Sequence, residues 1–373
     1  MPFGQGHDTI LSMINRKKTK SVSVGSIGLG SKYPVVIQSM TKVATTDVSK
    51  CLKQVIHLAQ AGCGLVRIAV PTQNDTAALA KIIAKSPVPI IADIHFSPAR
   101  AIEAIEAGAA KIRLNPGNIK NKADIFKIID CAKSHKIAIR IGVNEASIRD
   151  LKQADVPESK RVSLMLREMK KYITLFEKRG FDNIVLSAKS TDTLRTIEIN
   201  RAISANFDYP VHLGLTHAGL PEDAAIPSAV AVGTLLAEGI GDTVRISLAG
   251  DPVEEAAFAK KILASVGLYK TQSPELIVCP TCGRCQIDVV KLARQIKKAI
   301  AKIDKPIKIA VMGCVVNGPG EAADADIAVC AAKGKGFIYR LGEKIATIDE
   351  ADLVSAMLKE IDSLVKSNDA IKS

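Results

Sequence analysis

Residues 90–114 read IIADIHFSPARAIEAIEAGAAKIRL and contain one complete structural repeat of the chain. A short apolar run at 90–94 is followed by Ser97-Pro98, a polar helix cap with proline at the first helical position. An alanine-rich segment then ends at Gly108, and a second apolar run follows at 111–114. The stretch predicts a strand, a helix and a further strand, with strands buried on both faces as in a parallel sheet.

The same pattern recurs through the first 268 residues. Short β-branched runs occur at 35–38, 66–70, 90–94, 111–114, 137–143, 183–187, 211–215 and 243–248. A helical pattern follows each run, so the sequence predicts an eight-stranded β/α (TIM) barrel. An open, doubly wound α/β sheet is the alternative fold, but no G-x-G-x-x-G motif lies between a strand and a helix.

The pattern changes after residue 273. Strands are predicted at 275–278, 307–311, 327–329 and 337–347, and helices at 286–303 and 350–365. This segment predicts a smaller α+β domain. We therefore divide the chain into a barrel at 1–268, a linker at 269–276 and the α+β domain at 277–373.

Composition limits the class of protein. Of the 373 residues, 47% are apolar and 3% aromatic, and no apolar run is long enough for a membrane span or like a secretory signal. Eight cysteines without a secretory context argue against a disulfide framework. We expect a cytoplasmic protein. The net charge of +13 suits a lysine-rich surface, and the scarcity of aromatic residues argues against nucleic-acid binding.

Cations lie within the predicted strands, where a buried guanidinium is costly unless it is paired or reaches a wet cavity. They are Arg67, Arg113, Arg140, Lys189 and Arg245. The acids on these strands, chiefly Asp93, are too few to neutralise all of them. Because arginine forks suit phosphate oxygens, we predict a phosphate or diphosphate site at the carboxyl ends of the strands. Structural ion pairing is the alternative interpretation.

Further polar residues end the predicted strands, and in a barrel these ends meet on one face. They include Asp93, His95, Asn115, Asn144, His217 and Ser247. Each alone is typical of a loop residue that makes hydrogen bonds. Together they are candidates for binding the substrate.

The cysteines of the smaller domain suggest a metal centre. Cys279 and Cys282 form a C-x-x-C pair, Cys314 lies in a glycine-rich loop, and Glu321 follows seven residues later. Thiolates select zinc or iron–sulfur clusters, and a carboxylate in the fourth position would be exchangeable. Cys285 offers an alternative all-cysteine site with Cys279, Cys282 and Cys314. Spacing decides neither between the two sets nor between zinc and iron.

Six motifs together resemble those of one family. They are QSMT from residue 38, ADIHF from 92, RLNPGNI from 113, RIGVN from 140, CPTC from 279 and GCVVNGPGE from 313. These motifs look like those of the 4-hydroxy-3-methylbut-2-enyl diphosphate synthases of the non-mevalonate isoprenoid pathway. The similarity covers nearly the whole chain in order and implies the short, two-domain bacterial form.

The resemblance implies a β/α barrel joined to a ferredoxin-reductase-like α+β domain that carries a [4Fe–4S] cluster. The family's ligands map onto Cys279, Cys282, Cys314 and Glu321, and Cys285 matches none of them. The implied substrate is 2-C-methyl-D-erythritol 2,4-cyclodiphosphate. The family's diphosphate contacts and a further substrate-contacting position match Arg67, Arg113, Arg140, Lys189 and Ser247.

The implied reaction is a reductive ring opening in which two electrons from ferredoxin or flavodoxin pass through the cluster and one hydroxyl leaves as water. Glu321 would also be catalytic, because it gives up its place on the iron to the substrate. The family's cluster domain lies far from its own barrel mouth. The resemblance therefore implies a head-to-tail homodimer that builds each site from two chains.

The chain departs from the family after the seventh strand. The family usually reads Thr-Glu-Ala-Gly there, with the glutamate as the favoured proton donor, whereas this chain reads Thr216-His217-Ala218-Gly219. An imidazolium can also donate a proton, so His217 is a catalytic candidate; alternatively, it only hydrogen-bonds the substrate. Two other functions fit the sequence: a basic, zinc-bearing nucleic-acid-binding protein, and a non-redox barrel enzyme with structural zinc.

Overall fold

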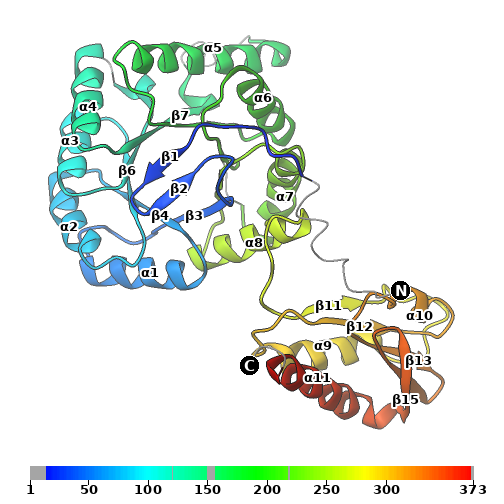
Figure 1. Cartoon of the computed structure of the whole chain (residues 1–373). Helices are drawn as coiled ribbons and strands as arrows, with labels where there is room; N and C mark the ends of the chain where they lie inside the picture. Colours follow the sequence, from blue (N-terminus) through cyan, green and yellow to red (C-terminus); the bar gives the residue numbers. More distant parts are fainter. Residues whose placement is uncertain (1–13, 120, 149–155, 217–218, 371–373) are drawn as a thin grey trace. The chain divides into compact units, whose positions relative to one another are not determined.

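The computed structural model describes residues 14–119, 121–148, 156–216 and 219–370. The chain divides into two compact units, residues 1–269 and 270–373 (Figure 1). Among the described residues, no helix has both the length and the apolar character that a membrane span needs.

The first unit is a barrel of eight parallel strands, and its strand order is β8-β7-β6-β5-β4-β3-β10-β9. A parallel bridge between Leu186 and Val211 joins the two ends of this sheet. The predicted barrel is therefore confirmed, and the open sheet is wrong. The strands are β3 (Val36–Met40), β4 (Leu65–Ala69), β5 (Ile90–Ile94), β6 (Lys111–Leu114), β7 (Ala138–Asn144), β8 (Ile184–Lys189), β9 (His212–Leu213) and β10 (Thr243–Val244).

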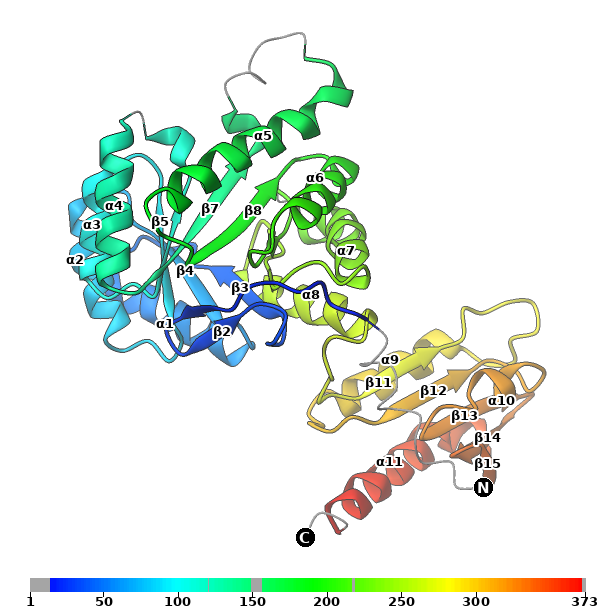
Figure 2. The same cartoon turned by 45° about the horizontal axis from the view of Figure 1, so that its top comes forward.

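Helices surround these strands (Figures 1 and 2). Asp47, Ser97 and Asp251 cap three of them, as their side chains accept backbone N–H groups of the first turn. Ile, Val, Leu and Ala side chains from both layers form the main core. The helices are α1 (Val48–Gln60), α2 (Gln73–Ile83), α3 (Pro98–Glu106), α4 (Lys122–Ser134), α5 (Glu158–Glu177), α6 (Thr193–Asn206), α7 (Pro221–Ala237) and α8 (Pro252–Ser265).

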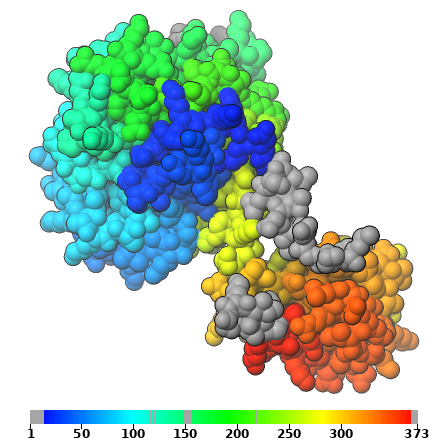
Figure 3. All heavy atoms as spheres, in the orientation of Figure 1, coloured from blue at the N-terminus to red at the C-terminus, as the bar shows by residue number. Residues whose placement is uncertain are grey.

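An N-terminal hairpin, which the sequence did not predict, covers one end of the barrel. Strands β1 (Val22–Val24) and β2 (Ile27–Leu29) pair antiparallel around Gly25, whose φ is +58°. Apolar side chains of the hairpin pack with Leu65 and Ala138, which begin β4 and β7. Figure 3 shows this segment in dark blue over the barrel. The hairpin closes the amino ends of the strands and leaves the carboxyl ends for a site.

The second unit is a five-stranded sheet in the order β11-β12-β13-β14-β15. Its elements are β11 (Glu275–Val278), α9 (Val289–Ile300), β12 (Lys308–Met312), α10 (Gly318–Glu321), β13 (Ile327–Ala332), β14 (Lys335–Arg340), β15 (Glu343–Asp349) and α11 (Leu353–Ala370). The single strand predicted at 337–347 is wrong. Leu341 and Gly342 have φ of +50° and +82°, so the chain turns back there as a hairpin between β14 and β15.

Candidate functional site

The strand cations lie where the sequence predicted, at the carboxyl half of the barrel. Arg67, Arg113, Arg140 and Lys189 belong to β4, β6, β7 and β8, and Arg245 follows β10. Arg113 is register partner to both Asp93 and Arg140, so successive strands place these side chains side by side. Arg140 is 2% exposed and Arg113 is 6% exposed. Their charges are therefore desolvated.

Asp93 is shared by three of the predicted residues. Its Oδ1 lies 3.5 Å from an Arg113 nitrogen and 3.9 Å from an Arg67 nitrogen, and its Oδ2 lies 3.1 Å from His95 Nε2. Burial pushes the pKa of Asp93 upward, but Arg67, His95 and Arg113 outweigh that effect and lower the pKa. Asp93 is therefore an anion that orients cations and cannot serve as an acid.

Arg245 has a partner that sequence reasoning missed. Glu255, in the first turn of α8, accepts hydrogen bonds of 3.0 and 3.2 Å from Arg245. It also accepts one of 2.8 Å from Ser39 and lies 3.2 Å from Lys42 Nζ. Glu255 lies on a helix, so the acids of the predicted strands do not include it. A helix carboxylate that turns inward therefore neutralises one of the cations assigned to the substrate.

Arg140 and Lys189 have no acid partner among the described residues. Two Arg140 nitrogens, Nε and Nη1, are buried without hydrogen-bond partners. Burial, then Arg67 and Arg113, lower the pKa of Arg140, and burial and Arg140 lower that of Lys189. Guanidinium nevertheless stays charged in proteins. An unpaired buried cation costs several kcal/mol, so its retention favours an anionic ligand over structural ion pairing.

Two further buried polar residues lie deeper in the barrel and were not predicted. Lys111 and His212 are fully buried, and Lys111 Nζ and His212 Nε2 have no hydrogen-bond partner among the described residues. Burial and neighbouring cations, Arg140 foremost, lower the pKa of both groups well below their usual values, so both environments favour the neutral form. Side chains two residues apart point to the same face of a strand, so Lys111 shares the face of Arg113 on β6. This spacing could have predicted that Lys111 is also buried inside the barrel.

The predicted amides hold the loops at this end. Asn115 Nδ2 donates to Ser147 Oγ at 2.9 Å, and Ser147 in turn donates to the Asn144 carbonyl at 2.7 Å. Ser247 is half-buried beyond β10, and the His95 side chain is 53% exposed. These residues thus lie at the mouth, whereas His217 lies outside the described residues.

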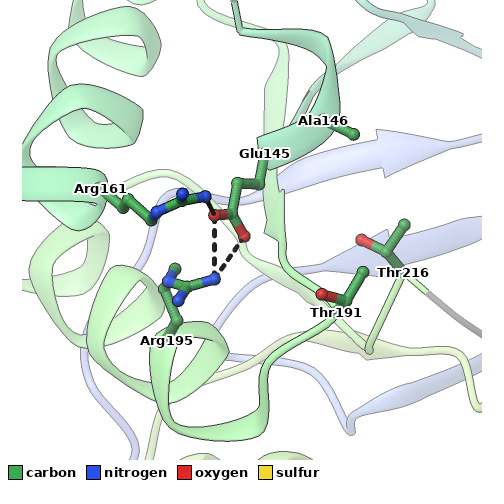
Figure 4. Close-up of a pocket in the computed structure, with 6 residues that line it drawn as sticks. All are labelled: Glu145, Ala146, Arg161, Thr191, Arg195 and Thr216. Carbon is green, nitrogen blue, oxygen red and sulfur yellow. Dashed lines mark hydrogen bonds and ion pairs between the residues drawn. The ribbon is translucent and has the colours of Figure 1, made fainter. Parts of the chain in front are cut away.

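A pocket of about 220 Å³ opens beside these loops (Figure 4). Glu145, which follows β7, lines this pocket and is 8% exposed. Its carboxylate accepts hydrogen bonds of 2.9 Å from Arg161 and Arg195 and another from the Ser190 hydroxyl. Burial raises the pKa of Glu145, but these three hydrogen bonds outweigh burial and lower it. Glu145 therefore fastens the end of β7 to the end of β8.

Thr191 and Thr216 line the other side of this pocket. In Figure 4 their side chains lie opposite Glu145, and the Oγ1 of Thr216 is buried without a hydrogen-bond partner among the described residues. The pocket thus includes the residue that precedes the predicted proton donor, His217, in the sequence.

The three predicted cysteine ligands of the second unit lie on two neighbouring loops, and the fourth ligand, Glu321, lies on a short helix. Cys279 and Cys282 follow β11, and Cys314 follows β12, which pairs parallel with β11. A 2.9 Å hydrogen bond from the Gln286 amide to the Gly313 carbonyl joins the loops. Glu321 ends α10 and is exposed.

Cys314 has the chemistry of a thiolate ligand. Backbone N–H groups of Asn317 and Val316, together with the Arg284 side chain, lower the pKa of its thiol. Cys282 is exposed, while Cys279 and Cys285 are half-buried and pack against the core under α9. The donor set fits an iron–sulfur group in its chemistry. In the described part of the chain, however, no three Cys, His, Asp or Glu residues are gathered as a metal site.

Comparison with known proteins identifies the family. The model of the GcpE TIM-barrel domain matches residues 19–260, and that of the GcpE protein C-terminal domain matches residues 275–363. The chain belongs to the GcpE family. This GcpE chain is 47% identical to the 4-hydroxy-3-methylbut-2-en-1-yl diphosphate synthase (flavodoxin) of Malacoplasma penetrans, over 93% of this chain and 95% of the relative. The family predicted from the motifs is confirmed.

Other relatives extend the match. Proteins of the same name from Clostridium perfringens and Aquifex aeolicus are 44% and 40% identical, over 94% and 95% of this chain and 100% and 99% of theirs. Among solved structures, a dihydropteroate synthase from Stenotrophomonas maltophilia with bound imidazole matches at a TM-score of 0.51 and 16% identity. It covers 66% of this chain and 98% of its own, a likeness in fold alone.

Proposed function

We propose that the chain converts 2-C-methyl-D-erythritol 2,4-cyclodiphosphate to 4-hydroxy-3-methylbut-2-enyl diphosphate. In this reaction two electrons and two protons enter, the ring C–O bond to phosphate breaks, and one hydroxyl leaves as water. The names of the relatives support the product. The structural observation that supports the proposal is the group of buried cations at the barrel mouth. Of these, Arg140 and Lys189 have no acid partner in the part of the chain that the structure describes.

The barrel residues would bind and orient the substrate. Arg140, Arg113 and Lys189 would hold the diphosphate, because fixed donors in a dry site bind phosphate oxygens strongly. Asp93 would keep Arg67 and Arg113 in place through the two ion pairs described above. Arg245, already paired with Glu255, would act at most through its remaining donors.

A [4Fe–4S] cluster would be held by Cys279, Cys282, Cys314 and Glu321. It would supply single electrons to the substrate when bound. The lowered pKa of Cys314 supports this set, because a metal ligand must be the thiolate. We propose flavodoxin as the electron donor, as the relatives' names specify, and ferredoxin as the second candidate.

His217 would hold one of the two protons that the reaction consumes. Anionic phosphates nearby favour the protonated imidazole, so its pKa should rise when substrate binds. Glu145 is a poorer candidate acid, because three hydrogen bonds hold it as an anion. A cytoplasmic location and the absence of nucleic-acid binding stay predictions.

The decisive experiment uses protein purified without oxygen. We expect iron and acid-labile sulfide, and conversion of the cyclic diphosphate when a dithionite-reduced viologen dye supplies electrons. Zinc in place of iron, with no conversion, would contradict the proposal and favour the barrel protein with structural zinc.

We also propose the head-to-tail homodimer. At a substrate concentration far below the raised KM of Arg140→Ala, where neither variant alone has measurable activity, mixing Cys314→Ser chains with Arg140→Ala chains should restore part of the activity. One of the two mixed sites would then have both an intact barrel and intact ligands. The absence of recovery, once mass spectrometry shows that subunits exchange, would contradict the shared site.

A further inference from the structure

The helix that follows the cysteine loop carries an unusual concentration of positive charge. Helix α9 contains four cations and no acid: Lys291, Arg294, Lys297 and Lys298. All four are exposed. With 3.6 residues per turn, they and Val290, which is 46% exposed, fall within a stripe roughly 120° wide.

The opposite face of α9 is fully used by the fold. Val289, Leu292 and Ile296 are buried in the core between the helix and the sheet. Figure 2 shows α9 lying along β11 and β12. The cationic stripe is therefore fixed in direction by packing and points away from the sheet.

The four cations also lack local partners. On α4 and α5 some exposed cations pair with acids, as Lys127 does with Asp124 and Lys171 with Glu168. By contrast, no ion pair joins a cation of α9 to a carboxylate within the described residues. Self-repulsion along one helix face is unfavourable, and a bound acidic surface would relieve it.

The start of this helix touches the proposed ligand loops. A Cβ added to Gly313 would lie 2.9 Å from a Val289 methyl group, so the first residue of α9 packs against the residue before Cys314. Lys298 is nine residues further, or about 13 Å along the helix axis. Val289 itself belongs to the buried face, but the stripe begins in the same helical turn, at Val290 and Lys291. A protein seated on this end of the stripe would thus lie near the loop that carries Cys314.

We propose that this face of α9 is the docking surface for the electron donor, a flavodoxin whose docking face would carry carboxylates complementary to the four cations. The inference rests on the proposed function and extends it to a surface. Complementary charge would steer the encounter, and exposed Val290 would supply apolar contact within a charged rim. Because rim charges act mainly on association, the interaction should weaken steeply with salt.

The test compares two charge-matched variants of the full chain. K291E/R294E/K298E reverses the stripe, and K53E/K81E/K85E reverses three exposed lysines on or beside the barrel helices α1 and α2. We expect the first to weaken binding of oxidised flavodoxin, measured by calorimetry at low salt, by about tenfold or more. Its KM for reduced flavodoxin should rise in parallel, while turnover with a reduced viologen dye stays unchanged.

A neutral variant guards against local unfolding. K291Q/R294Q/K298Q keeps helix-forming residues and should give a smaller loss of flavodoxin binding, with an unchanged circular dichroism spectrum and iron content. Flavodoxin affinity in the reversed variant that matches the K53E/K81E/K85E control would overturn the proposal. A changed oligomeric state would also overturn it, and would assign the face to a second copy of the chain. If the unaltered protein does not convert the substrate with the reduced dye, the proposed reaction is wrong. The calorimetry would still test whether flavodoxin binds to this face of α9.

Discussion

The barrel mouth and the cysteine loops differ in how firmly the fold alone fixes the positions of their side chains. Arg113 and Arg140 lie on the paired strands β6 and β7, where they are register partners, and both are nearly fully buried. Cys282 and Glu321 are exposed, on a loop and a four-residue helix. Strand side chains are fixed by packing, whereas loop ligands depend on the bond energy of the metal to draw them together. The first region is preorganised, and the second is expected to assemble with its cofactor.

The largest effect should come from breaking the second region. Cys314→Ser should abolish iron binding, because serine supplies no thiolate at neutral pH. Cys285→Ser is the matched control and should keep its iron, as measured by metal analysis of anaerobic protein. Equal loss in both variants would mean that Cys285 is a ligand and Glu321 is not.

The loop after β9 should show the next largest effect. His217→Gln should lower kcat by about a hundredfold or more with little change in KM, since general acid catalysis contributes on that scale. His217→Glu should recover much of the rate, because a carboxylic acid can donate the same proton. A near-normal kcat for His217→Gln in steady-state assays would remove this residue from the mechanism.

Within the barrel, paired and unpaired arginines should behave in opposite ways. Arg140→Met should weaken substrate binding by about 1.5–3 kcal/mol, seen as a raised KM, because a charge-assisted contact is lost. It should not lower the substrate-free Tm, since it removes an unpaired buried cation. Arg245→Met should lower the Tm, because buried Glu255 loses its closest cationic partner. Equal destabilisation by both variants would favour structural ion pairing.

The smallest effect concerns Glu145. Glu145→Gln should lower the free energy of unfolding by about 1–2 kcal/mol at pH 7, because a buried charge-assisted acceptor is lost. The folded-state pKa of Glu145 is depressed, so its contribution is present above the unfolded value of about 4.3 and is lost as the pH falls through the folded pKa. The difference from the unaltered protein should therefore shrink in acid, as measured by urea unfolding.

Glu158→Gln provides the control for that comparison. Glu158 contacts the same two arginines, but its side chain is 73% exposed against 10% for Glu145. Solvent screens such a pair, so the loss should be smaller. Equal losses of unfolding free energy in the two variants would show that the burial of Glu145 does not strengthen its interactions with the arginines.

Local sequence predicted most of the architecture. The strands predicted at 90–94 and 111–114 match β5 and β6 to the residue. Each is a short apolar run bounded by the end of one helix and the start of the next, and a run of that length favours a buried strand. The hairpin turn at Leu341 and Gly342 was missed, because a single glycine within an apolar run is a weak turn signal. The N-terminal hairpin was missed too, since its strands are only three residues long.

The sequence by itself determined the barrel, the family and the identity of the cations, because these depend on local propensity and on residues adjacent in the chain. Only the tertiary structure decided which cations are neutralised. Arg245 meets Glu255 from a helix, and Glu145 meets Arg195 from fifty residues away, whereas Arg140 meets no acid among the described residues. The energy of a buried charge depends on the groups within a few ångströms of it, and folding brings those groups together from distant parts of the chain.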